Sequence, residues 1–254
     1  MIRSITFGLV FVFASTAWAQ SPPLGAVVQT QHYDPVANLV FLTIANASHK
    51  DITAYNMSIK ETYADGHVRN HEIMADYVGR IALVKESQGT PDEADIRQQF
   101  GDGLFHSGET RQEIVGVQPG LKDIHVVVDV VTYADQTTEA TNVDGLQRIV
   151  GHRKSEIAST KLADDIIKAA LADPSDADPA TTAATKIQER ITLWEARKHT
   201  ALEEQLETGL LGSVVGELKG ISEHKNKRDA LNQYLTKSEQ RIETLAPHAE
   251  GGPQ

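Results

Sequence analysis

The sequence contains no cysteine. This excludes disulfides, thiol chemistry and cysteine-ligated metal sites, so an exported form of the chain would have to fold by packing alone. Basic clusters are also missing, and the formal net charge of −11 at pH 7 argues against nucleic acid and anionic lipid as partners. Outside the N-terminus, no apolar run is long enough to cross a membrane.

The N-terminus has the pattern of a secretory signal peptide. Arg3 gives a positive start, residues 5–17 are almost all apolar or small, and Ala17-Trp18-Ala19 supplies the small-x-small pattern that precedes cleavage. We therefore expect a signal peptide at residues 1–19, cleaved after Ala19, and a periplasmic or secreted mature chain. An uncleaved membrane anchor is the alternative, whereas a lipid anchor is excluded because no cysteine follows the cleavage site.

The mature chain changes character near residue 143. Before this point β-branched residues alternate with a period of two, and after it Ala, Leu, Glu and Lys recur with helical spacing. This order predicts an α+β protein, with an N-terminal antiparallel Ig-like β-sandwich at residues 20–143 followed by a C-terminal helical segment at 144–250. The helical segment is expected to be a helical hairpin or a short coiled coil, interrupted by an acidic linker at 172–180.

Alternation and turn residues predict about seven to nine short strands in the first half. The expected strands are residues 26–33, 38–46, 52–63, 67–74, 77–84, 110–117, 122–133 and 137–142. Asp65-Gly66 favours a hairpin between the third and fourth strands. Residues 85–107 are expected to form a long polar loop with one helical turn at 96–100. Asp129 is the polar exception in a valine-rich strand, and we expect the helices to cover its face of the sheet.

Three helical stretches follow. Asp144 is expected to N-cap a helix over 145–172, and a second helix starts near Ala180, with its buried side marked by Ile187, Ile191, Trp194, Ala201 and Leu206. A seam with 4-3-4-3 spacing then predicts antiparallel helix packing; its members are Leu231, Leu235, Ser238, Ile242 and Leu245.

Four glycines are the most unusual feature of the helical half: Gly209, Gly212, Gly216 and Gly220. Each costs a helix about 1 kcal/mol relative to alanine. We therefore expect a bend or a close contact with another helix to compensate. Dimerisation within a membrane is the alternative, but residues 210–218 are too few to span a bilayer.

Short turn motifs in residues 38–66 and 107–115 resemble the exported bacterial Ig-like, or fibronectin-like, modules of FxLYD type. Such modules combine an apolar strand, an Asn and a small residue, a long strand with a Tyr-Asp-Gly-like turn, and a Pro-Gly-Glu-Thr-like turn. The counterparts here are Leu39 to Ile44, Asn46, Ser48, Ile52 to Tyr63, Asp65-Gly66 and Ser107-Gly108-Glu109-Thr110. Ser107 replaces the usual proline, Ala64 intervenes before Asp65, and residues 85–105 are an insertion. The resemblance implies a binding or scaffolding role without catalysis.

Candidate catalytic and metal-binding residues are few. His67 and His71 would lie about 13 Å apart on a strand, too far for one metal ion. Ser107 beside His106 is more typical of a turn serine than of a nucleophile. The acidic residues of the 85–107 loop are Asp92, Glu93, Asp95 and Asp102. They could bind Ca²⁺, but the spacing of a calcium loop is missing and a solvated loop is favoured.

The sequence therefore predicts no catalytic, cofactor-binding or metal residue. The leading hypothesis is a non-catalytic exported protein-interaction or scaffolding module of the bacterial envelope, whose partner is another protein or envelope component, with possible self-association through the helices. Two alternatives stay open. One is a hydrolase in which Asp92, Asp95 or Asp102 converges with His106, and the other is a membrane-peripheral protein that uses the surface of residues 210–218.

Overall fold

The computed structural model describes residues 24–196 and 202–250, without the side chains of 202–207. The expected signal peptide at 1–19 and Ala201 lie outside the described residues, as does the side chain of Leu206. The described chain is an α+β protein. Its strands are β1 (Ala26–Asp34), β2 (Leu39–Asn46), β3 (Ile52–Tyr63), β4 (Val68–Asp76), β5 (Thr110–Gly116), β6 (Leu121–Tyr133) and β7 (Thr138–Ala140). Its α-helices are α1 (Val78–Glu86), α2 (Glu93–Phe100), α3 (Val143–Leu171), α4 (Pro179–Glu195), α5 (Leu202–Ser222) and α6 (Lys227–Leu245).

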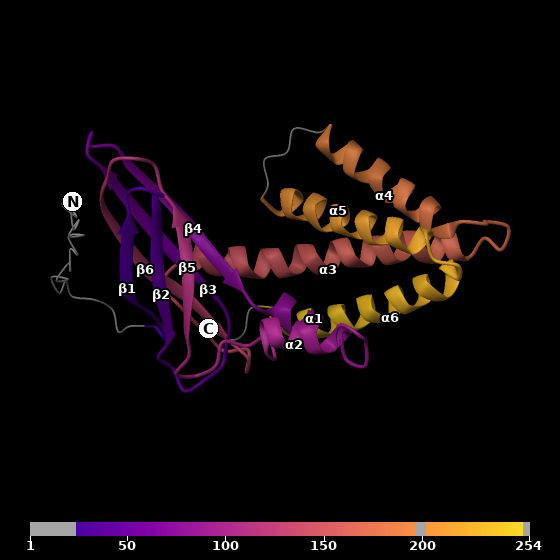
Figure 1. Ribbon diagram of the computed structural model, residues 1–254, viewed down its shortest axis with the longest axis horizontal. Coiled ribbons are helices and arrows are strands. Elements are labelled where there is room, and N and C mark those ends of the chain that lie inside the picture. Colours follow the sequence, from indigo (N-terminus) through magenta and orange to yellow (C-terminus); the bar gives the residue numbers. More distant parts are fainter. Residues whose placement is uncertain (1–23, 197–201, 251–254) are drawn as a thin grey trace, which may run out of the picture.

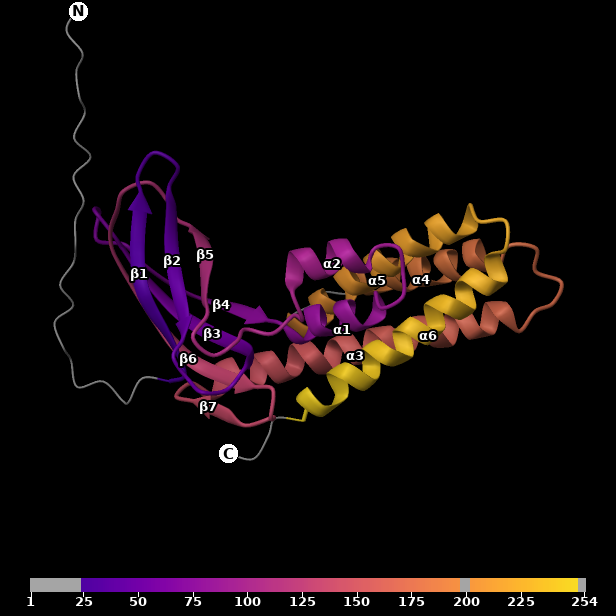
Figure 2. The ribbon, with the colours of Figure 1, turned by 60° about the horizontal axis from the view of Figure 1, so that its bottom comes forward.

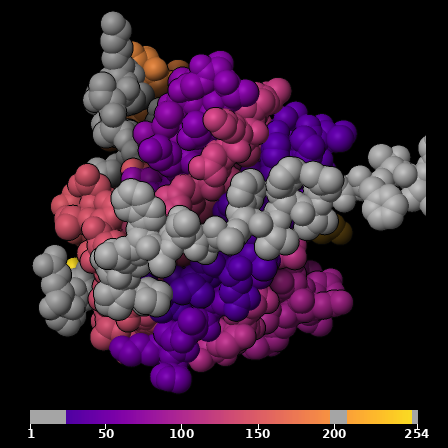
Figure 3. Space-filling view, turned by 90° about the vertical axis from the view of Figure 1, so that its left-hand side faces the viewer, coloured from indigo at the N-terminus to yellow at the C-terminus, as the bar shows by residue number. Residues whose placement is uncertain are grey.

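The strands form two antiparallel sheets, with the orders β1-β2-β5 and β4-β3-β6-β7. The sheets pack face to face as one two-sheet body at one end of the molecule, and the helices extend from it (Figure 1). Val40, Leu42 and Ile44 of β2 meet Tyr55 and Met57 of β3 in the core between the sheets. The space-filling view from that end shows mainly the strands of the body, in indigo to magenta (Figure 3).

Strand β3 shows why period-two alternation predicts this part well. Tyr55, Met57 and Ile59 point into the core between the sheets, whereas Asn56 and Ser58 point to the opposite face. Both faces are largely buried because the start of α3 covers the second one. The expected strand at 52–63 is confirmed residue for residue.

The alternation in β6 shifts at Asp129. Asn56 pairs with Val130 and Met57 pairs with Val128, so Asp129 is the extra residue of a β-bulge. As a result Val131 joins Val128 in the core between the sheets, whereas strict alternation would place Val131 on the same face as Asp129. The expected helix cover is present, since Ile149 of α3 packs on the outer face against Ala54 and Val130.

Residues 78–84 are helical, so the strand expected at 77–84 is wrong. Helix α1 covers Val78–Glu86 and α2 covers Glu93–Phe100, so the expected loop at 85–107 is largely a helical insertion between β4 and β5. The helices therefore do not all follow the strands in the chain. Figure 2 shows α1 beside α3 and α6, with α2 outside it.

The helical arm consists of α3, α4, α5 and α6. Asn142, not the expected Asp144, caps α3, because its side chain accepts a hydrogen bond from the Gly145 amide at 3.1 Å. The expected linker is a short turn from which Asp178 caps α4 through the Thr181 amide. The expected single helix from Ala180 is divided into α4 and α5.

The seam of α6 is confirmed, with Leu231, Leu235, Ser238 and Leu245 buried and Ile242 half-buried. Alanine is frequent in the core of the arm, which contains Ala163, Ala170, Ala180, Ala183 and Ala184. Within residues 24–196 and 202–250, none of the helices is apolar over enough residues to cross a membrane.

Candidate functional site

The insertion returns to the two-sheet body at the turn between β2 and β3. Ile52 and Phe105 exchange backbone hydrogen bonds of 2.9 and 3.2 Å. The Phe105 ring is fully buried against Tyr55 and Tyr77. The Arg111 guanidinium lies 4.3 Å from the centre of the Tyr77 ring. This apolar anchor fixes the segment that carries His106.

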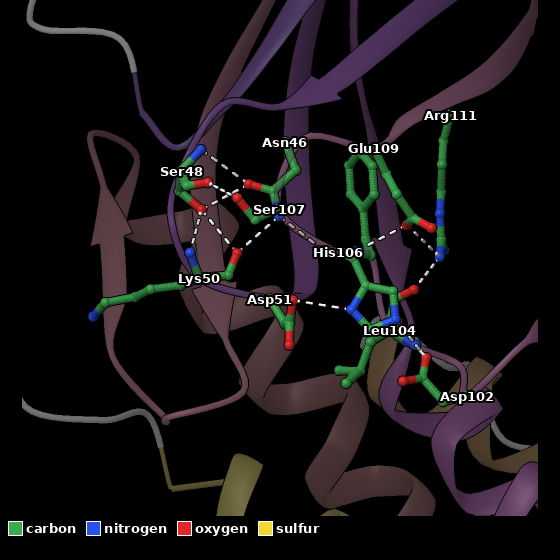
Figure 4. Close-up of polar contacts among 11 residues, drawn as sticks. Asn46, Ser48, Lys50, Asp51, Asp102, Leu104, His106, Ser107, Glu109 and Arg111 are labelled. Carbon is green, nitrogen blue, oxygen red and sulfur yellow. Dashed lines mark hydrogen bonds and ion pairs between the residues drawn. The ribbon is translucent and has the colours of Figure 1, made fainter.

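His106 lies between two carboxylates (Figure 4). Its Nδ1 lies 3.0 Å from Asp51 Oδ1, and its Nε2 lies 3.0 Å from Asp102 Oδ1. The backbone amide of His106 donates to Glu109 Oε2 at 2.8 Å. We call His106, Asp51, Asp102 and Glu109 the His106 cluster.

The protonated form of His106 suits this geometry. Neutral imidazole has one N–H donor, whereas imidazolium can donate to Asp51 and Asp102 at the same time. The hydrogen bond with Asp51 and the charges of Asp102, Asp51 and Glu109 raise the pKa of His106, against the opposing effect of partial burial. The cluster therefore joins the loop after α2 to the β2–β3 turn through the imidazole of His106.

Neighbouring polar side chains brace the same turn. The Asn46 amide, buried at the end of β2, donates to the carbonyls of Lys50 and Phe105, each at 2.8 Å. The Ser107 hydroxyl donates to the Ser48 carbonyl at 2.5 Å. Because both ring nitrogens of His106 face carboxylates, neither faces Ser107, and the geometry lacks a nucleophile–base pair.

The structure brings together only part of the acidic set expected on the insertion. Asp102 converges with His106, but Asp92 and Asp95 lie exposed at the start of α2. Glu93 pairs with Arg97 at 2.9 Å on the same helix. Among the described residues, no three His, Asp or Glu side chains are grouped to hold a metal ion.

The two histidines of the β4 hairpin lie apart. His67 stacks on Tyr63, with 5.9 Å between ring centroids. His71 points to the buried carboxylate of Glu61, with 3.5 Å between Nδ1 and Oε1. They contact different partners, in agreement with the strand interpretation of this segment.

A second cluster, which the sequence analysis missed, joins α3 to the body. The buried Arg153 donates to both oxygens of Asp76, from Nε at 2.8 Å and from a terminal nitrogen at 3.1 Å. It also donates to the His248 carbonyl at 2.9 Å and to the Thr132 hydroxyl at 3.2 Å. We call these four residues the Arg153 cluster. The guanidinium of Arg153, near the start of α3, thus binds both the body and the C-terminal end of the arm.

A third cluster joins the insertion to the arm. Arg241 of α6 donates to Glu156 of α3 at 2.9 Å and lies 3.6 Å from Glu86 of α1. Burial raises the pKa of Glu86, and the charge of Arg241 opposes this effect. The sequence pattern around Arg153 and Arg241 does not distinguish these two arginines from the exposed charged residues of α3 and α6.

Of the two compensations expected at the glycines of α5, a bend or a close helix contact, the close contact is absent from the described chain. Gly209, Gly212, Gly216 and Gly220 are exposed, and a Cβ atom added at any of them would meet nothing within 4 Å. By contrast, Leu211, Val215 and Leu218 are buried in the arm. Three of the apolar side chains expected to offer a membrane surface therefore point inward, whereas Leu210 and Val214 are half-buried.

Comparisons with known proteins add little. No protein-family model matches the sequence, and no curated protein matches it. One solved structure, of a hypothetical protein from Peptoclostridium difficile 630, is similar with a TM-score of 0.31 and 12% sequence identity. The similarity covers 48% of this chain and 89% of the other. At this level it carries no argument about fold or function.

Proposed function

We propose that this protein is a non-catalytic interaction or scaffolding module, exported to the bacterial envelope. Export rests on the N-terminal sequence pattern and on cleavage after Ala19. The two antiparallel sheets are compatible with an Ig-like module of FxLYD type, which is the finer form of the proposal. Its partner is a protein or envelope component.

The observation that carries the proposal is that His106 and Ser107, the candidate catalytic residues, both make contacts that hold the fold together. His106 holds two loops through Asp51 and Asp102, and the Ser107 hydroxyl is engaged by a backbone carbonyl. Neither the groove between α4 and α5 nor the small cavity beside Arg153 is lined by His106. These contacts favour a structural role for the His106 cluster over a catalytic role in a hydrolase.

One edge of the body is suited to a protein partner. Strand β5 is the last strand of its sheet, so the outer backbone groups of the strand are outside the ladder. Ile114 on this strand is 58% exposed. A partner segment could extend the sheet here, with Ile114 as an apolar contact.

The experiment compares two chromosomal variants of the full-length protein. His106→Gln should keep both the cellular function and the partner captured by in-cell crosslinking, whereas Ile114→Lys should lose the partner. N-terminal sequencing of the native protein should begin at Gln20. Loss of function in a folded, normally abundant His106→Gln protein would support the hydrolase instead. An intact N-terminus would refute export by cleavage.

A further inference from the structure

A groove runs between α4 and α5 on the outside of the arm. Its volume is about 610 Å³, and Thr185, Gln188 and Thr192 of α4 line one side while Val215 and Lys219 of α5 line the other. Leu193, at one end, is 59% exposed. The described polar side chains of the groove are small or uncharged, except Glu189 and Lys219.

Two glycines of α5, Gly212 and Gly216, share a side of the helix with Val215 and Lys219, since residues three or four apart are neighbours on a helix, although neither glycine lines the groove itself. Gly212 and Gly216 alternate along the helix with Val215 and Lys219, and all four described glycines leave the backbone uncovered. A helix can approach a surface without side chains more closely than any other helix surface. The helix loses stability at each glycine, and nothing within the described chain uses the space that is gained.

We propose that a second copy of this chain occupies the groove, so that two α4–α5 hairpins pack as a symmetric four-helix interface. A two-fold interface must be self-complementary, because the same patch serves both partners. The groove carries one acidic and one basic residue, Glu189 and Lys219. This inference goes beyond the proposed function, since copies could associate whether or not an envelope partner is bound.

The positions of the two charges fit such an axis. Thr185 and Val215 line the groove from opposite helices. Glu189 is four residues further along α4, and Lys219 is four residues further along α5, about 6 Å in each case. Since the two helices run in opposite directions (Figure 1), the charges lie on opposite sides of the Thr185–Val215 level. A two-fold axis at that level, lying in the plane of the interface and at right angles to the line from Glu189 to Lys219, places Lys219 of each copy beside Glu189 of the other.

The first test is the oligomeric state of the full mature chain by sedimentation velocity from about 1 to 500 µM. We expect a concentration-dependent dimer. Gly216→Leu should weaken it at least about tenfold by blocking close approach. The same variant should melt no lower than the parent, because its side chain has free space in the monomer. Gln233→Leu, on the exposed side of α6, is the matched control and should leave dimerisation unchanged.

The second test exchanges the charges. Lys219→Glu alone and Glu189→Lys alone should each weaken the dimer about fivefold at low salt, and the combined variant should recover it to within about twofold. A chain that stays monomeric at all concentrations overturns the inference. So does a dimer that survives Gly216→Leu or one that the charge exchange does not rescue. The crosslinking result for Ile114→Lys is independent of these outcomes, so the two proposals can fail separately.

Discussion

The two-sheet body and the helical arm reach stability with different side chains. The largest fully buried residues of the body include Tyr55, Tyr77 and Phe105, whereas Ala180, Ala183 and Ala184 lie at the centre of the arm. Large rings fill the wide space between sheets, and alanines allow helices to approach each other. The body thus depends on large rings and buried polar contacts, while the arm combines alanines with isoleucines and leucines at its helix contacts.

The difference extends to the surfaces. In the body, the polar side chains of Asn46, Asp129 and Glu61 are buried and hold particular partners. In the arm, threonines line an open groove, and the exposed glycines of α5 have no neighbour within 4 Å of an added Cβ atom. Substitutions of buried polar residues in the body should therefore disturb particular hydrogen bonds, whereas the groove surface of the arm should accept substitutions without loss of folding.

The largest effect is expected where the two regions meet. Arg153→Met leaves Asp76 buried without its partner and should lower the free energy of unfolding by about 3–5 kcal/mol. Urea titration followed by circular dichroism measures this.

The matched control is Arg148→Met, one and a half turns earlier on α3. Arg148 pairs with Glu72 at 2.8 Å, but its side chain is 34% exposed, so the loss should stay below about 1 kcal/mol. Equal effects of the two changes would show that body and arm do not depend on the Arg153 cluster.

An intermediate effect should distinguish the two kinds of core. Ala183→Leu adds volume where α4 packs closely and should destabilise the protein by about 1–3 kcal/mol. Thr185→Leu, exposed on the same helix, should change stability by less than about 0.5 kcal/mol. Tolerance of leucine at Ala183 would mean that the arm is loosely packed.

Glycines should respond with opposite signs in the arm and in the insertion that returns to the body. Gly212→Ala should stabilise the arm by about 0.5–1 kcal/mol, since its Cβ meets nothing. Gly103→Ala should destabilise, because φ is +89° and the added Cβ would lie 2.6 Å from the Ile81 amide nitrogen. Thermal melts of both variants measure the difference, and the same sign at both sites would contradict the comparison.

The sequence predicted the strands of the body well because their alternation is local. Strand β3 matches its expected bounds, but residues 77–84 failed because a short apolar run fits helix or strand equally. Helix α1 packs on α6, where Glu86 meets Arg241 from a distant part of the chain, and no local pattern shows this contact. The bulge at Asp129 was not predicted for a related reason, because strict alternation along a strand cannot show that one residue is inserted.

The candidate site was predicted in part. Asp102 and His106 are i and i+4 in the chain, and their convergence was considered from the sequence. Asp51, by contrast, comes from the β2–β3 turn, and only the pairing of Ile52 with Phe105 brings it to the ring. Long-range backbone pairing of this kind leaves no local pattern, so the second carboxylate could not be foreseen.

The smallest effect concerns the pH dependence of the His106 cluster. Because the folded state has a raised pKa, the stabilisation is complete below the unfolded value near pH 6.5 and is lost as pH rises through the folded pKa. The ring is 41% exposed, so the loss should be only a few tenths of a kcal/mol. NMR titration of the ring should place its midpoint above 6.5, and Asp102→Asn should lower it. Hydrogen exchange in α1 and α2, corrected for the intrinsic rate, should increase across the same range. A midpoint at or below 6.5 would mean that the imidazolium does not hold the insertion to the body.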